Sequence, residues 1–384
     1  MVASSRVERG KISRQDFLRL GGAGIAGAAM LASPAAAFAQ SGSGPYVEYR
    51  EHAPGGLSGG GFTSGIFTTS IDFDTLIPSW NARLPSGSAL GVELRVRYGG
   101  RWSGWLDMGR YSAADRSASA STAYPNWRVE VDTIQSRNGE RADAYQYRLT
   151  AASGSPRVSQ VAVVASQSAR HGEKINAGDL KRAWGKRLNV PLRSQYDFDA
   201  GAAWCSPTSV SMVTAYWGDL YDRSAWKRSV PATARGVYDA GARIWGNWPF
   251  STAYPAHLGL ASSVSRFNDI QQVERWIDAG IPVIASVAWD NRYGDRSLAN
   301  ASIPRAAYGH LLVIVGFTGA GDVIVNDPAS SPRSQVRRVY DRAQFSRAWL
   351  DSDRWRGGRS DGVVYLIRPR NKSIPGSWAA NGSW

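Results

Sequence analysis

Residues 203–213 read AWCSPTSVSMV, and this stretch contains Cys205, the single cysteine among 384 residues. The residues that follow it favour the start of a helix. Ser206 can cap a helix N-terminus, and Pro207 suits the first turn, where a missing N–H costs nothing. An apolar stripe at helical spacing comes next, and Gly218 is expected to end the helix. The stripe consists of Val210, Val213 and Trp217.

This position predicts a reactive cysteine. A helix N-terminus carries partial positive charge, which favours the thiolate over the thiol of Cys205. The competing interpretation is a small buried residue that fills a gap in the core, a common role of free cysteines. Exported proteins generally use cysteines in disulfide pairs, and one cysteine cannot form an internal pair. We therefore favour a nucleophile.

A thiolate nucleophile needs a proton-accepting partner, and the chain offers four histidines. His52 and His171 lie in glycine-rich and charged segments and are expected to be solvated, while His257 is a second candidate. His310 is followed directly by the apolar run 311–315, so we expect it at the start of a buried strand, held rigidly as a general base requires. The alternative is a core histidine that bonds only to the backbone.

A predicted hairpin supplies a third candidate catalytic residue beside Cys205 and His310. Apolar strands at 311–317 and 323–325 are joined by a glycine-containing turn, and their pairing places His310 within about two positions of facing Asp327. Asp327 can accept the imidazole N–H and orient the ring. Alternatively, residues 326–328 (Asn-Asp-Pro) only end the strand, because these residue types are common in turns.

Acyl transfer also needs hydrogen-bond donors for the developing oxyanion. The backbone N–H of Cys205 is one candidate. Gln195, ten residues upstream, is a candidate for a second donor through its side-chain amide, although a polar side chain in a loop is commonly just solvated. This chemistry requires no cofactor and no metal ion, and we expect none.

Five segments taken in order resemble the papain-like bacteriocin-processing (double-glycine) peptidases. The resemblance covers residues 188–368, about half of the chain. It implies a papain-like peptidase fold in which Cys205 is the nucleophile, His310 the base and then the acid, Asp327 the orienting residue and Gln195 an oxyanion donor. The segments are Val190–Gln195, Trp204–Val210, Gly280–Ile284, Gly309–Val313 and Val325–Pro328.

The chain departs from the family pattern in two respects. Ser206 stands where many members have glycine, and no transporter domain accompanies the peptidase. The chain is therefore expected to resemble the exported, stand-alone members of the family.

The chain is expected to have two folded domains. Short strands separated by Gly, Ser, Asn and Pro predict an all-β, sandwich-like accessory domain at 45–166. A linker is placed at 167–187, a peptidase domain at 188–370 and a C-terminal tail at 371–384. The clearest accessory-domain strand is 90–98, where apolar residues alternate with charged ones before Gly99 and Gly100 form a turn. Further strands are expected at 127–134, 145–150 and 158–165.

The peptidase region mixes helices with strands, which predicts an α+β fold. A helix from 269 to 279 ends at Gly280 and leads into a buried strand at 281–289. The other expected elements are the hairpin described above, a helix at 342–350 and a strand at 362–367.

The first 39 residues are predicted to be a cleavable export signal. Five basic residues precede an apolar, small-residue stretch at 21–38, and cleavage is expected after Ala39. Residues 13–19 resemble a twin-arginine export motif in which Gln15 replaces the second arginine. The alternative is an uncleaved membrane anchor. We expect a secreted or wall-associated protein without a membrane span after cleavage.

The formal charge is +14, and removal of the signal, with five bases and two acids, leaves +11. A basic surface favours polyanionic partners, and outside a cell these are wall polymers rather than nucleic acid; solubility alone is the other explanation. The leading hypothesis is a cysteine peptidase that hydrolyses peptide or isopeptide bonds in a peptide or protein substrate. The alternatives are a cell-wall peptide hydrolase or amidase, and a non-catalytic wall-binding protein on a peptidase scaffold.

Overall fold

The structure is a computed structural model that describes residues 45–54, 56–57, 60–113, 117–171, 178–351 and 360–375. The predicted signal peptide at 1–39 and most of the predicted tail lie outside the described residues. None of the helices in these ranges has the length and apolar character needed to cross a membrane.

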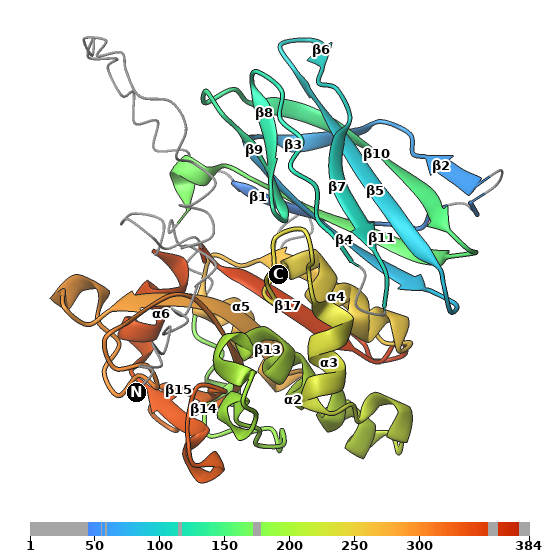
Figure 1. Cartoon of the computed structure of the whole chain (residues 1–384). Helices are drawn as coiled ribbons and strands as arrows, with labels where there is room; N and C mark the ends of the chain where they lie inside the picture. Colours follow the sequence, from blue (N-terminus) through green and yellow to red (C-terminus); the bar gives the residue numbers. More distant parts are fainter. Residues whose placement is uncertain are drawn as a thin grey trace, which may run out of the picture.

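The N-terminal domain consists of two antiparallel sheets (Figure 1). The first has the order β1 (Val47–His52), β11 (Arg157–Ser166), β4 (Thr75–Arg83), β9 (Thr133–Ser136) and β8 (Trp127–Glu130). The second has the order β2 (Gly61–Thr63), β10 (Ala142–Ser153), β5 (Ala89–Tyr98) and β6 (Arg101–Trp102), with β3 (Phe67–Phe73) beside β10 and β7 (Leu106–Tyr111) beside β5. Residues of both sheets form one buried cluster that includes Trp80, Trp127 and Tyr145. This is a sandwich-like arrangement.

The strongest strand signal of the sequence corresponds to β5. Its apolar residues are buried alternately, and Gly99 and Gly100 take φ values of 52° and 72° in the turn to β6. The segment 127–134 folds as two short strands, β8 and β9, rather than the single predicted strand. Val131 has a φ of 62° between them, which places a turn where an uninterrupted strand was expected.

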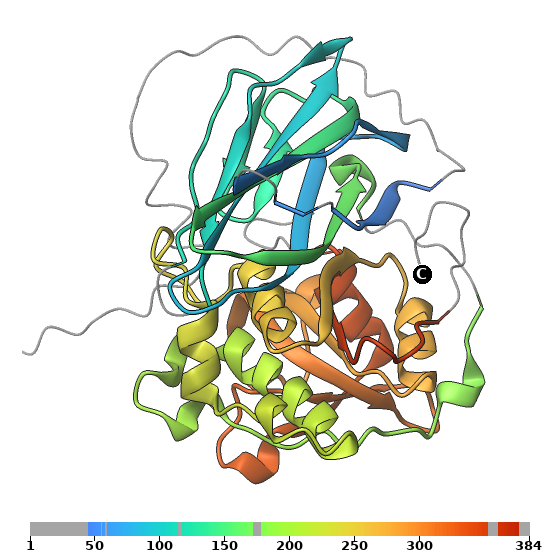
Figure 2. The same cartoon turned by 90° about the vertical axis from the view of Figure 1, so that its right-hand side faces the viewer.

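The C-terminal domain has a six-stranded antiparallel sheet flanked by helices. The strand order is β12 (Ala261–Arg266), β17 (Val363–Arg368), β13 (Val283–Asp290), β14 (Ala306–Phe317), β15 (Val323–Asn326) and β16 (Arg337–Tyr340). The helices are α2 (Cys205–Leu220), α3 (Val230–Val237), α4 (Trp248–His257), α5 (Ile270–Asp278) and α6 (Arg342–Leu350). Helices α2–α4 lie on one side of the sheet, and α5 and α6 lie on the other (Figure 2). The domain therefore mixes helices with an antiparallel sheet, as the α+β prediction requires.

Local sequence features predicted the boundaries of some of these elements accurately. Asp269 caps α5 in a capping box with Gln272, and Gly280 follows the helix with a φ of 77°. Helix α6 has the predicted bounds. Strand β14, by contrast, begins at Ala306, five residues before its predicted start.

The two domains share their cores. Helix α4 belongs to the peptidase region, yet its residues Phe250 and Ala253 lie in the hydrophobic cluster of the sandwich. Conversely, Val47 and Tyr49 of β1 belong to the cluster of the C-terminal domain. The N-terminal domain therefore supports the layer of helices that contains α2.

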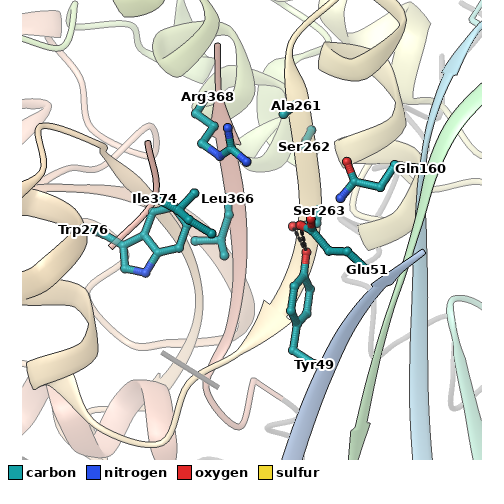
Figure 3. Close-up of a pocket in the computed structure, with 10 residues that line it drawn as sticks. All are labelled: Tyr49, Glu51, Gln160, Ala261, Ser262, Ser263, Trp276, Leu366, Arg368 and Ile374. Atoms are coloured by element: carbon teal, nitrogen blue, oxygen red, sulfur yellow. Dashed lines mark hydrogen bonds between the residues drawn. The ribbon is translucent and has the colours of Figure 1, made fainter. Parts of the chain in front are cut away.

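Buried polar contacts also join the domains. Asp132 accepts a hydrogen bond from the first backbone N–H of α4, at Trp248, with a distance of 3.0 Å. Figure 3 shows Tyr49 of β1 reaching β12, where its hydroxyl lies 2.9 Å from the Ser263 Oγ. The cavity beside this contact has a volume of about 10 Å³, which is room for about one water molecule.

The described part of the predicted linker packs on the peptidase domain. The indole N–H of Trp184 donates to Glu274 of α5 over 2.7 Å, and Trp184 and Arg187 form isolated bridges with the end of β14. Residues 178–187 therefore pack against the peptidase region.

Candidate active site

Cys205 is the first residue of α2. Ser206 was expected to cap this helix, and that prediction is wrong, because the helix begins at Cys205, two residues before the expected start at Pro207, and Trp204 occupies the N-cap position without a side-chain cap. The buried Ser206 hydroxyl instead lies 2.9 Å from the Ser251 Oγ of α4 and 3.3 Å from the Tyr365 hydroxyl of β17. The side chain points into the protein and ties α2 to its neighbours.

Helix α2 also continues past Gly218 to Leu220, where the sequence predicted a stop. A Cβ atom at Gly218 would lie 2.6 Å from the side chain of Lys227. Glycine at this position therefore permits close packing and does not end the helix.

A β-bulge next to His310 sets the direction of the imidazole. In the pairing of β13 with β14, Val287 faces His310 and Ala288 faces Tyr308, so Gly309 is the extra residue. Its φ of 126° is one that residues with a Cβ rarely adopt. Because β14 begins at Ala306, His310 is its fifth residue and lies inside a long strand, not at the mouth of one as expected. Trp289 packs edge-on against the imidazole with a centroid distance of 5.6 Å.

Asp327 follows β15 directly and is completely buried. Its Oδ1 accepts hydrogen bonds from His310 Nε2 over 2.8 Å and from the backbone N–H of Ala329 over 3.0 Å. Its Oδ2 accepts from the hydroxyls of Ser302 and Tyr340, both over 2.8 Å. Four donors thus fix the carboxylate, which in turn fixes the imidazole plane.

Cys205 and His310 lie close enough for each to shift the pKa of the other: His310 lowers that of the thiol, and Cys205 raises that of the imidazole. Because His310 uses Nε2 for Asp327, its other ring nitrogen, Nδ1, is the one left for the thiol. The structure thus brings Cys205, His310 and Asp327 together in one line of contacts.

The electrostatics favour an ion pair of thiolate and imidazolium. Burial alone would raise the pKa of Cys205, but the hydrogen bond and charge of His310, with the backbone N–H groups of Leu311 and Ser206, lower it below 9.0. Burial alone would likewise lower the pKa of His310, but Asp327 and Cys205 raise it from 6.5 to about 10. The pKa of Asp327 is lowered because His310 and the hydroxyl donors outweigh its burial.

Gln195 is buried in the loop that leads to α2. Its backbone N–H donates to the Pro328 carbonyl over 2.9 Å, next to Asp327 in the sequence. Its amide nitrogen donates to the Ala202 carbonyl over 3.0 Å, three residues before Cys205. The second N–H of this amide is left for another acceptor. The alternative of a merely solvated side chain therefore does not hold for Gln195.

The other three histidines lie away from Cys205, but His52 and His171 are not solvated as expected. His52 stacks on Phe67 with a centroid distance of 3.7 Å, and burial lowers its pKa to about 4. His171 is buried and lies 3.1 Å from the Ser166 Oγ. His257 ends α4, where its Nδ1 accepts from the Leu84 N–H over 3.2 Å.

Several residues of the site were not identified from the sequence. Ser302 and Tyr340 hold Asp327 from a loop and from β16, and no sequence spacing links them to it. Trp204, which precedes Cys205, packs edge to face on Trp245 with a centroid distance of 6.1 Å, and other half-buried aromatic rings contact this pair. The described residues contain no cluster of three or more His, Cys, Asp or Glu side chains arranged to hold a metal ion.

Two family models match this chain. Residues 187–354 match the model of the Peptidase C39 like family, and residues 12–166 match that of the Peptidase C39 N-terminal domain. The chain is therefore of the peptidase class of hydrolases. It belongs to the C39 family of papain-like peptidases, and its predicted family is confirmed.

A C39-like peptidase from Bacillus anthracis has a similar crystal structure. It shares 14% sequence identity, and the match covers 49% of this chain and 100% of that chain, with a TM-score of 0.34. The comparison with curated proteins gave no match.

Proposed function

We propose that this protein is a cysteine peptidase that hydrolyses peptide or isopeptide bonds through Cys205, His310 and Asp327. The observation that carries the proposal is the position of His310, whose Nε2 bonds to the buried Asp327 over 2.8 Å and whose imidazole lies beside Cys205 closely enough to shift the pKa of the thiol. A nucleophile, a base and an orienting carboxylate in this order are the parts that acyl transfer requires.

In the first step, the Cys205 thiolate attacks the carbonyl carbon of the scissile bond. The imidazolium of His310 then gives its proton to the leaving amine as the C–N bond breaks, which leaves an acyl-thioester on the sulfur. In the second step, neutral His310 removes a proton from water, and the resulting hydroxide attacks the thioester. The carboxylic acid product leaves and the thiolate–imidazolium pair is restored.

The oxyanion formed in both steps needs donors. The N–H of Cys205 lies at the first position of α2, where it has no intrahelical partner. The second amide N–H of Gln195 is our candidate for the other donor, since its amide bonds to the loop that enters α2.

We also propose that the protein acts outside the cell after removal of residues 1–39. The motif at 13–19 and the apolar stretch at 21–38 support export. The formal charge of +11 on the mature chain supports an additional affinity for anionic wall polymers, without nucleic acid as a partner.

Two other functions remain as alternatives to this proposal. One is a cell-wall peptide hydrolase or amidase with the same catalytic groups. The other is a basic wall-binding protein that retains the scaffold without turnover.

A digestion experiment tests the proposal and separates the alternatives. Mature protein is incubated with a complex peptide mixture and, in parallel, with purified peptidoglycan, and products are identified by mass spectrometry. We expect new peptide termini in the first arm, absent after alkylation of Cys205 with iodoacetamide. Products from peptidoglycan alone would favour the wall hydrolase, and retention on wall material without products in either arm would favour the binding protein.

A further inference from the structure

A pocket lined by three arginines lies at the far end of α2 from the proposed catalytic residues. It has a volume of about 510 Å³ and is lined by Arg83, Arg223 and Arg370 together with Tyr221, Trp226 and Leu258. Helix α2 has 16 residues and separates Cys205 from Tyr221. At about 1.5 Å per residue, this distance is about 24 Å, so the pocket is distinct from the candidate active site.

Three separate parts of the chain bring the arginines together. Arg83 ends β4 of the N-terminal domain, Arg223 follows α2, and Arg370 follows β17. The pocket therefore forms only when the two domains pack against each other. A site at a domain seam is a common location for a ligand.

The positive charge of the pocket is not balanced by protein carboxylates. No acidic residue lines it. Among the described residues, Arg83, Arg223 and Arg370 have no ion-pair partner, and Arg370 donates only to the Ser159 hydroxyl, over 3.1 Å.

The acidic residues closest in sequence do not change this. Asp219 is paired with Lys227 over 2.7 Å. Asp222 is exposed and lies between two lining residues in the sequence, but it does not line the pocket.

The negative ends of two helices offset only part of the positive charge of the three arginines. The residues that follow α2 and α4, Tyr221 and Leu258, both line the pocket, so two helix C-termini point toward it. Each C-terminus carries about −0.5 charge, which offsets about one of the three guanidinium charges. About two positive charges remain, and a phosphate monoester carries about −1.5 to −2 at neutral pH.

The arginines also repel each other. Burial and the charges of Arg83 and Arg368 lower the pKa of Arg370. Burial together with Arg83 and Arg228 likewise lowers the pKa of His257, at the end of α4. A bound anion would relieve this repulsion.

Apart from Asn371, the remaining lining is apolar and aromatic. The rings of Tyr221 and Trp226 lie 6.0 Å apart, and the Trp226 indole N–H is already bonded to the Leu258 carbonyl over 3.1 Å. These rings offer a surface for an apolar or flat group, and the arginine forks match the oxygens of a phosphate. We propose that this pocket binds a phosphate-bearing ligand with an apolar or aromatic group next to the phosphate.

Calorimetric titration of the folded protein at constant ionic strength tests this site. The probes are phenyl phosphate, inorganic phosphate and benzoate. We expect saturable binding of phenyl phosphate at one site, tighter than that of either other probe, because phosphate supplies more charge than carboxylate and the phenyl ring contacts the aromatic lining.

Two pocket variants and a control locate the binding. Arg83→Gln/Arg370→Gln is expected to weaken phenyl phosphate binding by about tenfold or more, because it removes two charge-assisted contacts. Arg223→Gln, whose side chain is exposed after α2, is expected to weaken it by about threefold without involving the domain seam. The control Arg101→Gln/Arg141→Gln removes two exposed charges of the N-terminal domain and should leave the affinity unchanged.

Equal weakening in the pocket variants and the control would show charge attraction without a site and would overturn the proposal. Tighter binding of benzoate than of phenyl phosphate would overturn the assignment of phosphate. Absence of saturable binding of phenyl phosphate would overturn both.

Discussion

Replacing Cys205 by alanine is expected to lower peptide hydrolysis by about 10⁴-fold or more, because no acyl-thioester can form without the sulfur. In free energy, a factor of 10⁴ is a loss of about 5.5 kcal/mol of transition-state stabilisation. The measurement is the initial rate of cleavage of a peptide identified by the digestion experiment. Unfolding in urea, followed by circular dichroism, checks that the variant stays folded.

His310→Ala supplies the comparison for this prediction. Groups that act as one unit have non-additive effects. The double variant Cys205→Ala/His310→Ala is therefore expected to be no slower than Cys205→Ala. Activity of Cys205→Ala within about tenfold of the wild type would place the nucleophile elsewhere.

Replacing Asp327 by alanine is expected to destabilise the fold by about 3–5 kcal/mol, since it removes one partner of a buried charged pair. It also leaves the donors of His310, Ala329, Ser302 and Tyr340 without their acceptor. The free energy of unfolding in urea at neutral pH measures this effect. Asp295→Ala, at a side chain that is 77% exposed, is the control and should change stability by less than about 0.5 kcal/mol.

The dependence of this effect on pH follows from the shifts in pKa. The lowered pKa of Asp327 contributes stability above 3.8, which is lost as the pH falls through the folded-state value. The raised pKa of His310 contributes stability below 6.5, which is lost as the pH rises through about 10. The difference between wild type and Asp327→Asn should therefore be largest between pH 3.8 and 6.5. A difference that does not vary with pH would argue against a charged pair.

Cys205, His310 and Asp327 could be predicted as candidate catalytic residues from the sequence. Each of them lies next to an apolar segment that is expected to form a helix or a buried strand. The hairpin then related two of them, and the observed register, with Val313 facing Asn326, places His310 diagonally across from Asp327. Ser206 was misassigned as the cap because a sequence fixes a helix start only to within one or two residues.

The helix and the strand that are buried between the two domains were not predicted from the sequence. Helix α4 is buried along nearly all of its length and contains Pro249 and Pro255, so it shows no single apolar face. Strand β12 reads Ala-Ser-Ser-Val-Ser-Arg and is buried throughout. The backbone N–H of Ser262 in this strand donates to the side-chain oxygen of Asn81 in β4. Periodicity detects one buried face, and it gives no signal where a second domain covers the other.

The residues that donate hydrogen bonds to Asp327 could not be predicted from the sequence either. Ser302 lies in an irregular loop, and Tyr340 is on a strand that reaches Asp327 only through the pairing of β15 with β16. The bulge at Gly309 is likewise defined only by its partner strand. Such residues become visible once the sheet register is known.

The central claim is that His310 holds Cys205 as a thiolate, and the pH dependence of alkylation tests it most directly. Because Cys205 is the single cysteine, the rate of modification by iodoacetamide, measured by mass spectrometry, reports on one group. A thiolate held by His310 predicts a rate that rises with a midpoint below pH 9.0 in the wild type, reflecting the lowered pKa of Cys205. In His310→Gln the midpoint should be higher, because only the backbone N–H groups of Leu311 and Ser206 then oppose the effect of burial. The same midpoint in both proteins, at or above 9.0, would contradict it.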